Sequence, residues 1–237
     1  MPSLQENIHR VQKAIQTAAA RQQKLPDEIT LVAVTKTFPA ALVNQAIRLG
    51  IRHIGENRIQ EARLKLPQVD RAAARHFIGH LQRNKVKYAV KLFDIIQSVD
   101  NIGLAEEINA RCAKISRKIP VLVEVNTSGE SSKFGCLPGE ALTLLKALDR
   151  LPNLSPRGFM TIAVFSEDPE RVRPCFKLLK EIFDEAQGLP LENANINTLS
   201  MGMSSDYEIA IAEGATMVRI GTAIFGERQE QVEELAD

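Results

Sequence analysis

The stretch LVAVTKTFPA at residues 31–40 sets the pattern from which the fold of this 237-residue chain is predicted. Its first five residues are uncharged and mostly β-branched, which favours a buried strand, and a helix is expected just after it. Lys36 stands at the end of that strand, although lysine is among the side chains least often buried without a partner. Lys36 therefore either reaches the surface or supplies an amine to a site at the strand's end.

The same pattern recurs along the chain, because each short apolar run is followed by a longer amphipathic stretch. Near-continuous Val, Ile and Leu runs are typical of strands covered on both faces, and their alternation with helices predicts right-handed βαβ units in a parallel sheet. After a helix at 3–23, the expected helices are 40–50, 58–66, 82–92, 101–115, 138–150, 168–187, 205–213 and 223–235. The expected strands are 30–35, 52–56, 75–80, 94–99, 120–126, 157–162, 197–202 and 217–221.

Eight strands, each followed by a helix, predict an α/β fold: a single (β/α)8 TIM-like barrel with an extra N-terminal helix. We expect one domain over residues 1–237, since there is neither an internal repeat beyond this alternation nor a low-complexity linker. The alternative is an open doubly wound sheet. No G-x-G-x-x-G motif follows the first strand, which counts against the dinucleotide-binding form of that alternative.

Composition narrows the class of protein. With 30 basic and 29 acidic residues the net charge is +1, so neither nucleic acid nor a membrane surface is an expected partner. The basic run NKVKYAVK at 84–91 is interpreted as a solvated helix face. Three scattered cysteines without C-x-x-C predict a reduced, cytoplasmic protein, and four histidines without H-E-x-x-H predict no metal site. No signal peptide or membrane span is expected, and a monomer is favoured.

Several unusual residues fall where the predicted strands end, which is the active face of a barrel. Each also has an ordinary interpretation: His80 can cap or pack, Arg219 can pair inside the core, and Ser205 with Glu208 fits a capping box. Their shared face is what predicts a site. The candidate residues are Lys36, Asn57, His80, Ser200, Met201, Gly202, Ser204, Arg219, Gly221 and Thr222.

The loops after the last two strands have the composition of a phosphate site. SMGMSSD at 200–206 and IGT at 220–222 place glycine and hydroxyl groups just before helix starts, where backbone N–H groups favour an anion. In a closed barrel the first strand neighbours the eighth, so Lys36 approaches this site. Burial and the nearby Arg219 favour a deprotonated, nucleophilic amine. The implied ligand carries a carbonyl and a phosphate, as pyridoxal phosphate (PLP) or the sugar phosphate of a Schiff-base aldolase does.

Seven motifs together resemble a known family. They are LVAVTKTFP, GENRIQE, HFIGHLQRNK, VNTSGESSKFG, RGFMTI, LSMGMSSDYEIAI and VRIGTAIFG, and they span about residues 4 to 227. The chain resembles the pyridoxal phosphate homeostasis proteins, the YggS/PROSC-like family. The resemblance implies a barrel like the N-terminal domain of alanine racemase.

The resemblance also implies roles for the candidate residues. Lys36 would carry PLP as an internal aldimine, and Arg219 would face the pyridine nitrogen. The phosphate would be held by Ser200, Gly202 and Ser204 with the backbone of Gly221 and Thr222. Asn57 would lie near the ring hydroxyl, with His80 and Met201 around the ring. The KFG loop at 133–135 is either a mobile lid or an ordinary loop.

The expected function is PLP binding without clear enzymatic turnover, in intracellular PLP (vitamin B6) and amino-acid/keto-acid homeostasis. Arginine does not lose its proton, so a pyridine nitrogen facing Arg219 stays unprotonated and the cofactor is a poor electron sink. A racemase of this type also needs a second base, a tyrosine in alanine racemase. Here Tyr88 is expected in mid-helix, and Tyr207 in helix packing or at the rim. The alternative is a PLP-dependent amino-acid racemase, and a Schiff-base aldolase comes third. Recipient apo-enzymes and regulators are not identified by the sequence.

Overall fold

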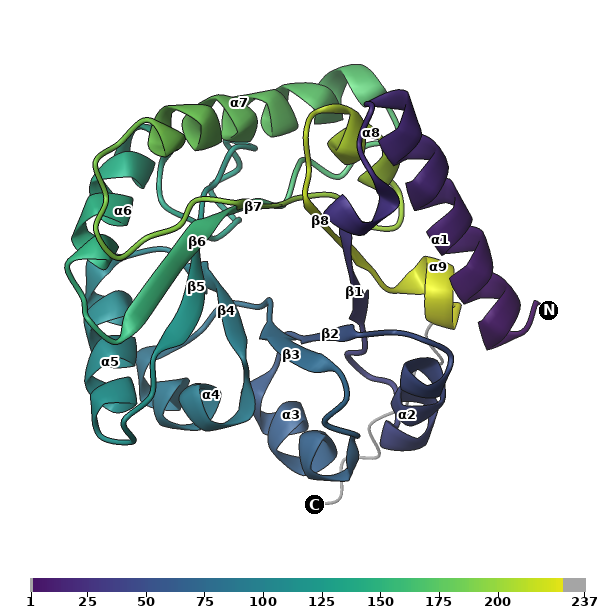
Figure 1. The fold of residues 1–237 in the computed structure, drawn as a ribbon, viewed down its shortest axis with the longest axis horizontal. Helices are drawn as coiled ribbons and strands as arrows, with labels where there is room; N and C mark the ends of the chain where they lie inside the picture. Colours follow the sequence, from purple (N-terminus) through teal and green to yellow (C-terminus); the bar gives the residue numbers. More distant parts are fainter. Residues whose placement is uncertain (1, 228–237) are drawn as a thin grey trace.

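The computed structural model describes residues 2–227 as a closed barrel of parallel strands ringed by helices (Figure 1). The strands follow one another in chain order, and β8 closes the barrel by pairing in parallel with β1. This arrangement confirms the predicted (β/α)8 barrel. The strands are β1 (Thr30–Val34), β2 (His53–Glu56), β3 (Ala74–Phe77), β4 (Ile95–Val99), β5 (Ile119–Glu124), β6 (Leu154–Met160), β7 (Thr198–Ser200) and β8 (Met217–Ile220).

The helices lie outside the barrel and agree in order with those predicted. They are α1 (Leu4–Arg21), α2 (Ala40–Arg48), α3 (Ile59–Lys65), α4 (Val86–Leu92), α5 (Ile102–Ala113), α6 (Ala141–Asp149), α7 (Pro169–Gln187), α8 (Tyr207–Ala212) and α9 (Thr222–Phe225). Short 3-10 turns occupy Pro26–Glu28, Leu66–Gln68, Arg83–Lys85 and Pro138–Glu140. The last helix, expected at 223–235, ends at Phe225, and residues 228–235 of that prediction lie outside the described residues.

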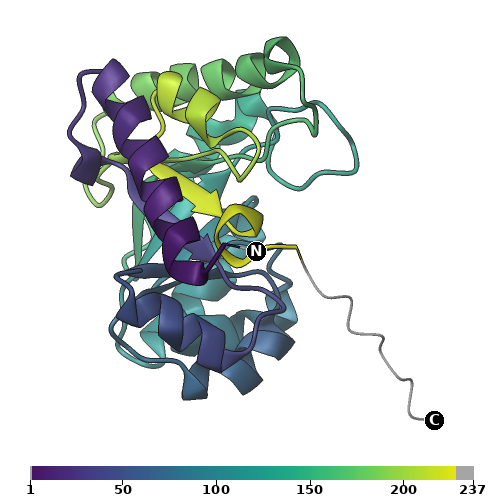
Figure 2. The ribbon, with the colours of Figure 1, turned by 90° about the vertical axis from the view of Figure 1, so that its right-hand side faces the viewer.

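The extra N-terminal helix α1 braces the part of the barrel that carries the last two strands (Figure 2). Ser3 and Glu6 form a capping box at its start, in which each side chain accepts from the backbone N–H of the other residue. Its buried face packs on α8 and α9, and Asn7 donates to the Ile224 carbonyl at 3.1 Å. α1 thus fixes the helices that follow β7 and β8.

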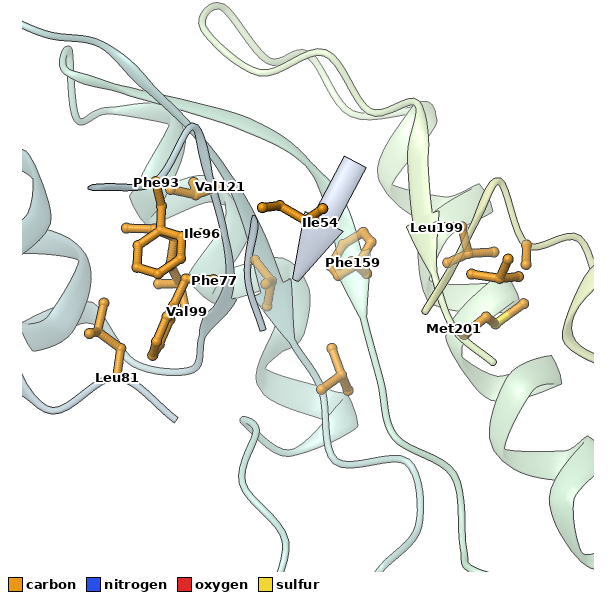
Figure 3. Packing of buried hydrophobic residues seen from close by; sticks show 14 of the residues in the cluster. Ile54, Phe77, Leu81, Phe93, Ile96, Val99, Val121, Phe159, Leu199 and Met201 are labelled. Carbon is orange, nitrogen blue, oxygen red and sulfur yellow. The ribbon is translucent and has the colours of Figure 1, made fainter. Parts of the chain in front are cut away.

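The hydrophobic core lies mainly between the barrel wall and the helices. Phe77 and Phe93 meet there edge to face with ring centroids 5.1 Å apart, and Phe159 and Leu199 are fully buried in the same layer (Figure 3). Side chains alternate along a strand, so the residues between these apolar ones point into the barrel. The barrel interior is therefore where β3, β4, β7 and β8 can place polar groups.

β6 and β7 approach each other closely at a glycine. Gly158 has a φ of +142°, and a Cβ atom placed on it would lie 1.9 Å from the Thr198 carbonyl oxygen. A side chain at this position would push β7 outward. Since β7 ends at Ser200, Gly158 also decides how deeply the loop after β7 is seated.

Replacing Gly158 by alanine is expected to lower the free energy of unfolding by about 2–4 kcal/mol, because both the φ angle and the space exclude a methyl group. Urea unfolding of Gly158→Ala would measure the loss. Gly139→Ala is the matched control, since a Cβ there meets nothing within 4 Å, and its effect should stay within about 0.5 kcal/mol. Equal stabilities of the two variants would contradict the close approach of β6 and β7.

Candidate functional site

A cleft of about 470 Å³ opens at the carboxyl ends of β1 and β8 and beside the loop after β7. Its size is typical of small-molecule sites. Five of the ten predicted residues line it: Lys36, Ser204, Arg219, Gly221 and Thr222. Phe165 stands at its edge with 92% of its surface exposed.

The turn that carries Lys36 is held by side chains of α3, outside the barrel. The next residue, Thr37, has a φ of +70°, which is unusual for a β-branched residue. Its N–H donates to Glu61 Oε1 at 2.6 Å, and Lys65 Nζ donates to the Thr35 carbonyl at 2.7 Å. Hydrogen bonds on both sides of Lys36 therefore fix the backbone where β1 ends.

The hydrogen bonds that hold the turn at Lys36 depend on a buried ion pair. Lys65 is 7% exposed and lies 2.7 Å from Glu56 Oε1 and 2.6 Å from Glu61 Oε1. Burial raises the pKa of Glu56, while the charge of Lys65 acts against that rise. Breaking a buried pair leaves a charge uncompensated, so the turn at Lys36 is tied to a contact that is costly to lose.

Arg219 forms the floor of the cleft and is 3% exposed. Its Nη1 donates to Ser200 Oγ and its Nη2 to the Thr161 carbonyl, both at 2.7 Å. Burial lowers the pKa of Arg219 to about 10, although the charges of Asp206 and Glu124 oppose this. The guanidinium is thus a cation at neutral pH.

The loop between β7 and α8 brings the Ser204 hydroxyl to the backbone donors that follow β8. Ser204 Oγ accepts from the N–H groups of Gly221 and Ala223, both at 3.3 Å. Gly202 shapes this loop with a φ of +94°, and a Cβ on it would lie 2.6 Å from Ala210 Cβ. Hydroxyl and N–H groups that suit an anion therefore meet where the loop after β7 approaches the end of β8.

The predicted capping box of Ser205 with Glu208 is wrong. The N-cap of α8 is Asp206, and no side-chain hydrogen bond caps the helix. The Asp206 carboxylate instead accepts from the N–H of Met203, which closes the tight loop before the helix begins. Burial raises the pKa of Asp206.

The chain is similar to known proteins over nearly its whole length. The model of the alanine racemase N-terminal domain family matches residues 3–229. A pyridoxal phosphate homeostasis protein of Aquifex aeolicus is 42% identical over 225 residues, which cover 94% of this chain and 98% of that protein. The chain belongs to the pyridoxal phosphate homeostasis proteins, within the alanine racemase N-terminal domain family.

Solved structures of related proteins have the same fold as this chain. PipY of Synechococcus elongatus without PLP superposes with a TM-score of 0.80 at 36% identity, covering 90% of this chain and 99% of PipY. The PipY structure with PLP bound gives a TM-score of 0.74 at 33% identity, with 90% and 100% covered. Alanine racemase of Clostridium difficile has a TM-score of 0.75 at 16% identity, with 96% of this chain and 57% of that chain covered, which supports the shared barrel fold alone.

The other residues that were predicted for the site do not line this cleft. Ser200 and Met201 are fully buried; Met201 packs in the core. Asn57 and His80 line a second hollow of about 150 Å³ at the ends of β2 and β3. His80 stacks on Phe134 of the KFG loop with centroids 3.9 Å apart.

Sequence reasoning missed one buried acid in this family member. Glu124 ends β5, is 6% exposed, and its Oε2 has no hydrogen-bond partner among the described residues. Burial, with a smaller contribution from Asp100, raises the pKa of Glu124 to about 7, and Arg219 opposes the rise. A lone carboxylate in the apolar run PVLVEVN was the available signal.

Glu124 should make the fold less stable as the pH rises. Its pKa is raised from 4.5 to about 7, so between these values the folded protein keeps a proton that the unfolded chain releases. The stability of Glu124→Gln relative to wild type should therefore increase by roughly 2–3 kcal/mol between pH 4.5 and pH 8. Urea unfolding at both pH values tests this, with the exposed Glu181→Gln as control. A pH-independent difference would contradict the assignment.

Proposed function

We propose that this protein binds pyridoxal 5'-phosphate in the cleft and acts in intracellular PLP homeostasis, with Lys36 as the point of covalent attachment. The observation that carries the proposal is that an amine, a fixed guanidinium and a set of hydroxyl and N–H groups line one cleft. The name of the relatives and the PLP-bound structure of PipY support it. When bound, PLP supplies an aldehyde that reacts with primary amines.

The described residues fit the three ends of such a ligand. We assign the phosphate to Ser204, Thr222 and the backbone of Gly221. Gly221 also keeps β8 close to β1, because a Cβ on it would lie 3.3 Å from Val34 Cβ. Arg219 is assigned to the ring nitrogen.

The remaining predicted residues take supporting roles in this proposal, and Ser200, which was expected at the phosphate, is assigned to Arg219 instead. Gly202 shapes the phosphate loop, and Ser200 acts beneath the ring through Arg219. Asn57 and His80 approach from the neighbouring hollow, and Met201 packs behind the loop.

We favour a carrier over a racemase because of the charge and the tyrosines. A protonated arginine at the ring nitrogen disfavours the electron-sink chemistry that racemisation requires. Among the described residues neither tyrosine lines the cleft. The guanidinium carbon of Arg63 lies over the ring of Tyr88, 4.2 Å from the ring centroid, and Tyr207 packs against the core.

The pure protein is accordingly expected to show no sustained racemisation or transamination of amino acids. Chiral chromatography and keto-acid assays over hours, with PLP present in excess, would measure turnover. Rates well above those of free PLP with the same amino acids would contradict the carrier function and favour the racemase.

Lys36→Ala should abolish the borohydride-stable PLP adduct and the visible band of the bound cofactor, because no other residue is assigned as the attaching amine. Borohydride reduction followed by peptide mass mapping locates the adduct. Lys13→Ala, on the exposed face of α1, is the control and should behave as wild type. An adduct that persists in Lys36→Ala would show that another amine holds PLP.

We further propose that the chain acts as one PLP-binding domain, as a monomer in the cytoplasm. Within residues 2–227, no helix has the length and apolar character to cross a membrane. The three cysteines are free and buried. Recipient apo-enzymes would be the partners of such a carrier.

A further inference from the structure

A chain of polar side chains crosses the interior of the barrel from the floor of the cleft. Arg219 Nη1 donates to Ser200 Oγ at 2.7 Å, and Ser200 Oγ donates to Gln97 Oε1 at 2.7 Å. Gln97 Nε2 lies 2.8 Å from His76 Nδ1, and His76 Nε2 lies 3.0 Å from His53 Nδ1. These five residues come from β8, β7, β4, β3 and β2, so only the closed barrel brings them together.

The direction of every hydrogen bond in this chain follows from Arg219. A guanidinium has donors and no acceptor, so Ser200 accepts from it and can give its own proton to Gln97 Oε1, which lies 2.7 Å away. With its oxygen accepting, the amide of Gln97 turns its nitrogen toward His76 Nδ1, which is then an acceptor.

A sulfur atom confirms the orientation of the amide independently. Gln97 Nε2 also lies 3.2 Å from Met217 Sδ. A thioether sulfur is a weak acceptor and no donor. In the flipped amide the oxygen of Gln97 would face this sulfur, which has no proton to donate, so the contact with Met217 would be lost.

The chain fixes one tautomer at its far end. His76 is fully buried, and burial with a smaller contribution from His53 lowers its pKa to about 3, so the ring is neutral. With Nδ1 accepting from Gln97, the His76 proton sits on Nε2 and is donated to His53 Nδ1. His53 is then left with its own proton on Nε2.

At the near end the chain holds the guanidinium in place. Arg219 is anchored twice, by Ser200 and by the Thr161 carbonyl, so its plane has no freedom to rotate. Ser200 alone would be a freely rotating hydroxyl. Gln97 directs the hydroxyl proton away from Arg219 and leaves the serine lone pairs facing the cation.

We propose that Ser200, Gln97 and His76 are positioning residues for PLP, which hold the Arg219 guanidinium in the one orientation that meets the ring nitrogen. This inference rests on the proposed function for its ligand, whereas the hydrogen-bond chain itself is a property of the protein alone. The residues act through Arg219 and touch no ligand.

A matched pair of serine deletions tests the positioning role. Ser200 and Ser98 are both fully buried strand residues, but Ser98 Oγ has no hydrogen-bond partner among the described residues. Both Ser200→Ala and Ser98→Ala remove a buried hydroxyl oxygen, but only Ser200→Ala also removes a hydrogen bond to Arg219.

The readouts are the dissociation constant for PLP and the pH midpoint of the bound chromophore, measured by absorbance and fluorescence. Ser200→Ala should raise the dissociation constant about tenfold, since it removes a charge-assisted hydrogen bond, and should shift the pH midpoint. Ser98→Ala should match wild type in both. If the two variants behave alike, the positioning role is overturned. If wild-type protein binds no PLP, the proposed function is overturned, and the positioning role for PLP is overturned with it.

The chain of hydrogen bonds has its own test in the protein without added PLP. The 15N chemical shifts of His76 should show the Nε2–H tautomer in wild type. Gln97→Glu keeps the shape of the side chain but offers His76 an acceptor, so His76 should then carry a proton on Nδ1. A proton on Nδ1 in wild type, or no change in Gln97→Glu, would overturn the chain whatever PLP does.

Discussion

The buried positive charge of Arg219 is the constraint on which the site depends. Burying an arginine side chain to 3% exposure is costly unless its donors are paired. The barrel meets that cost with a hydroxyl from β7, a carbonyl that follows β6, and the opposite charges of Asp206 and Glu124. Each partner comes from a different part of the chain, so the cation is stable only where the closed barrel assembles all of them. The approach of β6 to β7 at Gly158 belongs to the same constraint, because it seats the end of β7.

The two basic side chains of the cleft, Lys36 and Arg219, are positioned from opposite sides of the barrel wall. Arg219 is held from inside the barrel, through Ser200 and the polar chain behind it. The turn at Lys36 is held from outside, where Lys65 bonds the Thr35 carbonyl and pairs with carboxylates of β2 and α3. This separation leaves the wall itself to apolar packing. It also means that the geometry at Lys36 and the geometry at Arg219 can be altered separately by mutation.

The fold and half of the candidate residues followed from local sequence, whereas the polar interior did not. Val and Ile runs that alternate with amphipathic stretches are local signals, and eight of them sufficed to predict the barrel. Residues that follow the strand ends, such as Lys36 and Ser204, inherit their position from that topology. The contact between Ser200 and Gln97 joins residues 103 positions apart, and it depends on strand register that no motif encodes. Ser205 with Glu208 shows the opposite case, since a correct local pattern was overridden by the tight loop that Asp206 closes.

For the proposed PLP carrier, the distribution of charge would favour holding and releasing the ligand over transforming it. The side of the cleft assigned to the phosphate offers hydroxyl and backbone N–H groups, and the positive charge of Arg219 at the floor is partly opposed by two buried acids. In that assignment a dianionic phosphate would be bound by directed hydrogen bonds more than by a strong net field, so its release would require no buried ion pair to break. Covalent attachment through an amine is itself reversible by exchange with other amines. The proposed position of Arg219 at the ring nitrogen would limit further chemistry at the same time. In the proposed function one side chain would therefore serve both properties of a carrier, because it would orient the ring and keep the ring a weak electron sink.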